Sequence, residues 1–127
     1  MSRKILIMAA ALVFLALLSV TEQAMVARVT GEALAGTRAI ASDIRAHALD
    51  RAAEKARTLD LAWDQAAKKL ELLVDHSSTD EVRYAFSRLL AALEGEDRAG
   101  ALIYAGELEG AIEHVYERQA LTAENVL

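Results

Sequence analysis

The sequence predicts an all-α protein in which a single N-terminal transmembrane helix is followed by an extracytoplasmic bundle of about four antiparallel helices. Three observations support this fold class. The 127 residues contain no proline and are rich in alanine, leucine and glutamate, which favours helices. An uncharged run occupies residues 5–21, and beyond it apolar residues recur at every third or fourth position. We therefore divide the chain into a membrane anchor, residues 1–21, and one bundle domain, residues 22–127.

The N-terminal segment has the composition of a membrane anchor. Arg3 and Lys4 precede the run ILIMAAALVFLALLSVT, which spans about 26 Å at about 1.5 Å per residue and so just crosses a hydrocarbon core of about 30 Å. A cleaved signal peptide and a buried core helix are the alternatives, but small residues are poorly placed for cleavage. We expect a retained single-pass anchor in the cell membrane, with its N-terminus in the cytoplasm because the positive residues precede the run.

The charge and the cysteine content exclude several classes of function. Two of the 14 basic side chains precede the uncharged run and all 19 acidic side chains follow it, so the bundle domain carries a net charge of −7. Phosphate contacts need a basic face, and we therefore expect no nucleic-acid partner. The absence of cysteine excludes a disulfide scaffold, a thiolate metal site and a cysteine nucleophile.

Apolar spacing predicts the first two helices of the bundle domain. The spacing within residues 26–44 predicts that the anchor continues as a helical stalk to about His47, with or without a break near Gly31 or Gly36. Asp50 is the residue type of an N-cap and is expected to begin the second helix. That helix carries a seam that expects a partner helix, formed by Ala52, Ala56, Leu59, Trp63, Ala66, Leu70 and Leu73.

Capping signals predict the limits of the third helix. Ser78 stands three positions before Glu81, the spacing of a capping box, and is expected to begin it. The stretch LEGED ends it, with Gly95 suited to a left-handed C-cap and Asp97 placed to cap the fourth helix. The third helix has one apolar stripe, formed by Val82, Phe86, Leu89, Leu90 and Leu93. The motif DRA occurs at residues 50–52 and 97–99, which indicates two helical hairpins of similar design.

The fourth helix is expected to pack closely and to stop at Gln119. Its inward face consists of Tyr104, Leu108, Ile112 and Val115. Gly106 and Gly110 would let neighbouring backbones approach. Thr122 can cap a short turn, so that the tail LTAENVL folds back as a lid over a bundle opening, with Glu124 and Asn125 bonded to an adjacent helix end. A frayed terminus and a partner-docking peptide are the alternatives.

The sequence contains no motif for a catalytic residue, a cofactor site or a metal site. We therefore expect that the protein is not an enzyme. None of the three histidines has a glutamate three residues before it, as di-iron bundles require, and no glycine-rich phosphate loop occurs. The row of Glu109, Glu113 and Glu117 is interpreted as a solvated face or as a contact for a basic partner or a cation. Six side chains are candidates for interaction or for facing a ligand: Trp63, His76, Tyr84, His114, Glu124 and Asn125. For Trp63 the simpler interpretation is the largest core residue.

Several stretches together resemble a known family. They are LLVDHSSTDEV, LEGED and the closing EHVYERQALTAENVL, and they resemble the small bacterial membrane-anchored family catalogued as domain of unknown function number 4363. The residues that match its pattern are His76, His114, Leu121, Glu124 and Asn125. The resemblance implies a single-pass anchor and an extracytoplasmic helical domain, typically in Gram-positive bacteria, and it implies no activity. The chain departs from the family in being rich in alanine and arginine.

These observations predict a non-enzymatic, membrane-anchored accessory or scaffold protein whose acidic bundle contacts another membrane or envelope protein. The alternative is an extracytoplasmic sensor or small-ligand-binding module that uses the space around Trp63, His76 and Tyr84. The sequence names neither the partner nor the oligomeric state.

Overall fold

The computed structural model describes residues 2–72, 74 and 76–126, the last five of them by their backbone. The described residues form four helices and no strand: α1 (Arg3–Arg45), α2 (Leu49–Leu70), α3 (His76–Glu94) and α4 (Arg98–Val126). The predicted all-α class and the number of helices are confirmed.

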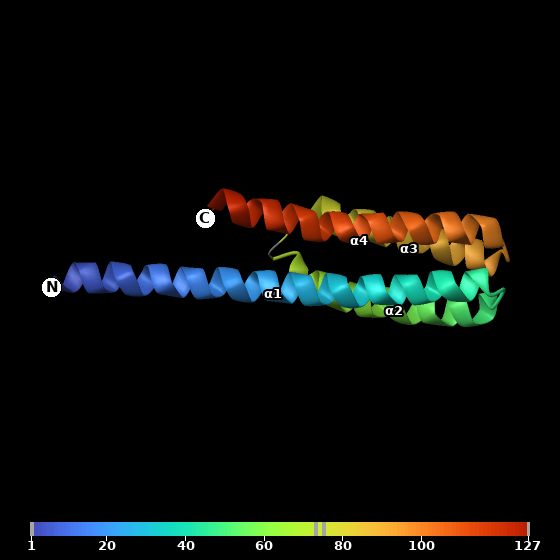
Figure 1. Cartoon of the computed structure of the whole chain (residues 1–127), viewed down its shortest axis with the longest axis horizontal. Helices are drawn as coiled ribbons and strands as arrows, with labels where there is room; N and C mark the ends of the chain where they lie inside the picture. The colour runs from blue at the N-terminus through green and yellow to red at the C-terminus, as the bar shows by residue number, and fades with distance from the viewer. Residues whose placement is uncertain (1, 73, 75, 127) are drawn as a thin grey trace.

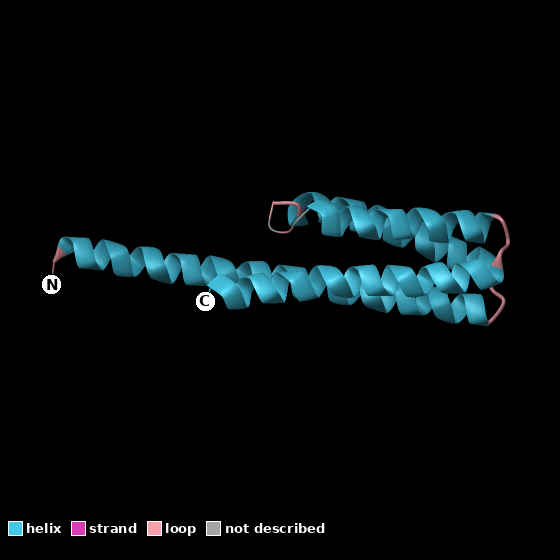
Figure 2. Cartoon of the chain, turned by 90° about the horizontal axis from the view of Figure 1, so that it is seen from above, coloured by secondary structure: helices cyan, strands magenta, loops and turns pink. Residues whose placement is uncertain are grey.

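The four helices lie side by side and are joined by short turns. Figure 1 shows that the chain runs out along α1, returns along α2, runs out again along α3 and returns along α4. α1 packs against α2 and α4, and α3 packs against the same two helices. The N-terminal part of α1 projects beyond the other helices in both views, and the end of α4 lies at that same end of the bundle (Figure 2).

α1 is one uninterrupted helix, exposed in its N-terminal part and packed in the bundle from Val26 onward. Neither Gly31 nor Gly36 breaks it, and the segment expected as a stalk is a bundle helix, with one buried face formed by Val26, Thr30, Ala33, Thr37, Ile40 and Ile44. The hydroxyls of Thr30 and Thr37 donate to the carbonyls four residues earlier, at 2.7 and 2.8 Å, which allows both threonines to be buried.

The core follows the apolar stripes expected for the four helices. Its largest fully buried side chains are Trp63, Phe86, Ile40, Ile44, Leu70, Leu89, Leu108 and Ile112. In the predicted α2 seam, Leu59 and Ala66 are only half-buried, while Ala53 and Ala67 are buried in addition. Leu73, the last member of that seam, lies outside the described residues.

The turns after α1 and α3 have the same geometry. His47 and Glu96 both adopt a left-handed backbone, with φ of 60° and 55°. The left-handed position expected at Gly95 therefore falls one residue later, on Glu96. Each of these residues is followed by the N-cap of the next helix, which is Ala48 for α2 and Asp97 for α4.

The two DRA motifs occupy different positions in these turns. Asp97 caps α4 as predicted, because its Oδ1 accepts from the backbone N–H of Gly100 at 3.0 Å. Asp50 is not the N-cap of α2 but lies in its first turn, where a carboxylate faces the positive end of the helix dipole. Arg98 donates from Nε to the carbonyl of Ile44 at 3.0 Å and from Nη2 to the carbonyl of Arg45 at 3.2 Å. A side chain of α4 therefore provides hydrogen bonds to two carbonyls at the C-terminal end of α1.

The expected capping box at Ser78 is wrong. α3 begins at His76, so Ser78 lies inside its first turn and is buried. The Ser78 hydroxyl accepts instead from Nη1 of Arg118 at 3.1 Å, and the Glu81 carboxylate faces His114. Both side chains therefore contact α4 instead of the backbone at the start of α3.

Two expectations for α4 are also wrong. Gly106 and Gly110 are exposed, and a Cβ at either position would meet nothing within 4 Å, so they do not mediate close packing within the chain. The helix does not stop at Gln119 but continues to Val126, so the tail does not fold back as a lid. Glu124 and Asn125 belong to its last turns, their side chains lie outside the description, and so does Leu127.

Candidate functional site

Trp63 lies in the core of α2, as the simpler interpretation predicted. Its side chain is 2 % exposed, and its buried indole N–H has no acceptor among the described residues. A cleft of about 110 Å³ adjoins it, here called the Trp63 cleft, lined by Val29, Glu32 and Ala33 of α1 and by Leu59, Ala62, Trp63 and Ala66 of α2.

His76 and Tyr84 do not line the Trp63 cleft. Tyr84 is 61 % exposed, and the side chain of His76 lies on the surface with Nδ1 3.9 Å from Oε2 of Glu71. The sensor alternative placed these two residues with Trp63 around one pocket. In the described structure, Trp63 faces the core while the other two face solvent.

His114 and the acidic row take part in contacts between helices. Nδ1 of His114 lies 3.3 Å from Oε2 of Glu81, which links α4 to α3. Arg38 of α1 lies 3.1 Å from Glu109 and 3.9 Å from Glu113, so part of the acidic row has a cation from its own chain. Among the residues that the structure describes, no three His, Asp or Glu side chains lie close enough to hold a metal ion.

Two charged clusters join neighbouring helices. Arg83 of α3 lies within 3.5 to 3.7 Å of Asp64, Glu71 and Asp80. Partial burial raises the pKa of the nearby Asp60 carboxyl above its ordinary value of 3.8, the charge of Asp64 raises it further, and Arg83 opposes both effects.

The second cluster lies near the turn that joins α1 to α2. There the largely buried Asp43 carboxylate is 2.8 Å from Nζ of Lys55.

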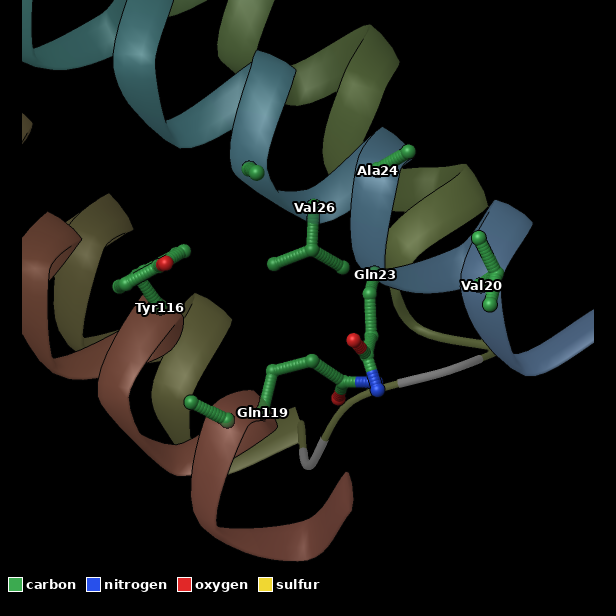
Figure 3. A pocket seen from close by; sticks show the side chains of 8 residues that line it. Val20, Gln23, Ala24, Val26, Tyr116 and Gln119 are labelled. Atoms are coloured by element: carbon green, nitrogen blue, oxygen red, sulfur yellow. The ribbon is translucent and has the colours of Figure 1, made fainter. Parts of the chain in front are cut away.

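A larger groove lies between α1 and α4, at the end of the bundle from which the N-terminal part of α1 projects (Figure 3). This junction groove has a volume of about 300 Å³ and is lined by Val20, Gln23, Ala24, Val26 and Ala27 of α1 and by Tyr116, Gln119 and Ala120 of α4. Figure 3 shows the side chains of Gln23 and Gln119 reaching toward one another from the two helices.

The described lining of the junction groove combines apolar side chains with two carboxamides. Among the residues that the structure describes, this lining includes no carboxylate, no histidine and no cationic side chain. Each carboxamide offers both donors and an acceptor, and the remaining lining is apolar apart from the Tyr116 hydroxyl. Sequence reasoning missed this site because two glutamines at opposite ends of a chain form no motif, and only the pairing of α1 with α4 brings them together.

Comparison with known proteins gives one match. The model of the family described as "Domain of unknown function (DUF4363)" matches residues 20–126, from the first residue of the junction groove to the end of α4. This match confirms the family that the sequence resembles. No curated protein and no solved structure matches the chain.

Proposed function

The chain belongs to this family of unknown function, and from that premise we propose that it is a non-enzymatic, membrane-anchored accessory protein whose acidic bundle contacts another membrane or envelope protein. The anchor would be the N-terminal part of α1, and the bundle would lie outside the cytoplasm. The proposal combines an apolar helix that can attach the protein to a membrane with a bundle surface that can contact a partner. The cleft and the groove described above bring together no set of catalytic side chains among their described residues.

The exposure of the N-terminal part of α1 carries the proposal. Its large apolar side chains, from Ile5 to Val20, are 43 to 66 % exposed, although they belong to a helix whose other half is packed in a bundle. A continuous apolar surface of this kind marks contact with a membrane or a partner, because its exposure to water is costly. Among the described helices, α1 is the one long and apolar enough to cross a membrane.

The charge distribution supports the proposed orientation. Arg3 and Lys4 lie at the free end of the projecting segment, and every acidic side chain follows it. Cytoplasmic flanks of membrane helices are enriched in lysine and arginine, so this arrangement favours a cytoplasmic N-terminus and an outer bundle.

Exposed apolar side chains on the bundle are the candidate contacts for a partner. Leu61 on α2, Tyr84 on α3 and Ile103 on α4 are 61 to 66 % exposed. Aromatic and apolar side chains at the centre of an interface contribute most of its binding free energy. These three positions, on three helices, therefore sample the bundle surface.

Site-specific photocrosslinking in intact cells tests the proposal. A photoreactive amino acid would replace Leu61, Tyr84 or Ile103 in turn, with exposed polar positions on the same helices as matched controls: Gln65, Ser87 and Glu107. We expect one of the apolar positions to yield a discrete adduct with a single membrane or envelope protein, identified by mass spectrometry. The absence of an adduct from all six positions, in a protein that carbonate does not extract from membranes, would contradict the accessory role.

A further inference from the structure

We propose that the junction groove binds the glycerol-ester region of a membrane glycerolipid, with the start of one acyl chain against α1. This inference rests on the proposed function, because it requires α1 to span the bilayer. It adds a lipid ligand to a bundle for which only a protein partner has been argued.

The position of the groove is the first argument. Val20 belongs both to the groove and to the exposed apolar segment, where it is 64 % exposed. Gln23 follows only three positions later, directly after Glu22, the first acidic residue of the chain. If residues 5–21 cross the hydrocarbon core, the groove lies at the boundary between that core and the lipid headgroups.

The chemistry of the lining is the second argument. Val20, Ala24, Val26 and Ala27 offer an apolar wall to an acyl chain, and the carboxamides of Gln23 and Gln119 can donate to ester carbonyls. Tyr116 is 48 % exposed and combines an apolar ring with a hydroxyl, the amphipathic character of aromatic residues at membrane surfaces. The eight described lining residues include no cation, so the neutral ester region fits this lining better than a phosphate does.

The size of the groove is consistent with a partial occupant. About 300 Å³ is the lower end of the range for small-molecule sites, and it is too small for a complete two-chain lipid. The remainder of the lipid's acyl chain would continue along the exposed apolar side of α1, so the lipid would not need to leave the bilayer.

Photolabelling of the full chain in lipid nanodiscs tests the inference. The probe is a phosphatidylcholine with a diazirine on the acyl carbons next to the ester, in a phosphatidylcholine bilayer. We expect labelled peptides from residues 20–27 and 116–120. Replacing both glutamines with leucine (Gln23→Leu, Gln119→Leu) approximately keeps the side-chain volume but removes the hydrogen bonds. It should lower this labelling by at least about fivefold, because the loss of one net hydrogen bond alone has about that effect.

Matched substitutions on α1 provide the control. Ala27→Trp places a bulky side chain in the groove and should abolish labelling of residues 116–120, whereas Ala35→Trp, also at an exposed alanine of α1 but outside the groove, should leave it unchanged. Labelling confined to residues 5–19, or equal in the wild type and both groove variants, would overturn the lipid site while leaving the anchor intact. Release of the wild-type protein from membranes by carbonate would overturn the anchor and the lipid site together.

Discussion

Trp63 is the largest fully buried side chain of α2. Trp63→Ala should lower the free energy of unfolding by about 3 to 5 kcal/mol, the usual cost of emptying a large aromatic core position. Trp63→Phe should cost less, because it also removes a buried indole N–H that has no acceptor among the described residues. The measurement is urea unfolding of the intact protein in detergent, monitored by circular dichroism.

A control for this prediction lies on the same helix. Leu61 is 66 % exposed, and Leu61→Ala should change the free energy of unfolding by less than about 0.5 kcal/mol. Equal losses from the two alanine variants would show that Trp63 is not a core residue.

Asp60 should make the bundle less stable as the pH rises. Its pKa in the folded state is raised above 3.8, chiefly by burial and then by the charge of Asp64. The folded state therefore binds more protons than the unfolded state in the window from 3.8 up through the raised pKa, and stability falls as the pH increases through that window.

Asp60→Asn should remove this dependence and raise the melting temperature at pH 7 relative to the wild type. Thermal melts of both proteins between pH 3.5 and 7 provide the test, since the range brackets the window that begins at the ordinary pKa of 3.8. Glu54→Gln, at an exposed position of the same helix, should leave the pH profile unchanged. A variant profile parallel to that of the wild type would rule out Asp60 as the source.

Local signals at the level of single residues predicted a contact only where no distant partner competed. Asp97 caps α4 as expected, because its carboxylate reaches a backbone N–H only three residues away. Ser78 and Glu81 had an equally good local pattern, but Arg118 and His114 of α4 face them in the folded bundle. A capping box could be read from the sequence, whereas the approach of α4 could not.

At the scale of the helices, Gly36 of α1 should respond to substitution differently from Gly106 and Gly110 of α4. Gly106→Ala and Gly110→Ala should each raise the free energy of unfolding by about 0.5 to 1 kcal/mol, because both positions are open and alanine favours helix. Gly36→Ala should bring no such gain, since its Cβ would stand 3.0 Å from the methyl carbons of Leu59. Chemical unfolding of the three variants measures the difference, and a loss at Gly106 would show that another molecule covers this face.

The two helix starts should also differ in their dependence on aspartate. Asp97→Ala removes an N-cap and should cost about 1 kcal/mol, while Asp97→Asn should retain most of the stability. Asp50→Ala removes only a charge in the first turn of α2, for which about 0.3 to 1 kcal/mol is usual, and raising the salt concentration should diminish this smaller loss. Equal, salt-independent losses at Asp50 and Asp97 would contradict the difference between the two turns.

The helices themselves were predictable to the extent that periodicity determines them. The buried stripes of α1, α3 and α4 follow their three-to-four spacing, because the same side chains face the core along the whole length of a helix. The end of α4 was not predictable from capping signals. Residues 120–126 contain neither glycine nor proline, so no residue there forces the helix to end at Gln119.

At the scale of the whole molecule, α1 joins the projecting segment to the bundle without a hinge. Composition and periodicity were enough to predict the segment and the bundle separately. The junction groove could not be predicted, because it depends on which faces of the first and last helices meet. Its location makes the orientation of α1 in the membrane the property on which both proposals depend.

The orientation can be tested with introduced cysteines, since the chain has none of its own. Ser2→Cys precedes the proposed anchor, and Ala99→Cys lies at an exposed position at the far end of the bundle. Because Arg3 and Lys4 should hold the N-terminus in the cytoplasm, a membrane-impermeant maleimide added to intact protoplasts should label Cys at position 99 but not at position 2. Permeabilised protoplasts serve as the control, in which both positions should react. Labelling of position 2 alone in intact protoplasts would reverse the topology, and a mature protein that lacks position 2 would show that the segment is a cleaved signal peptide.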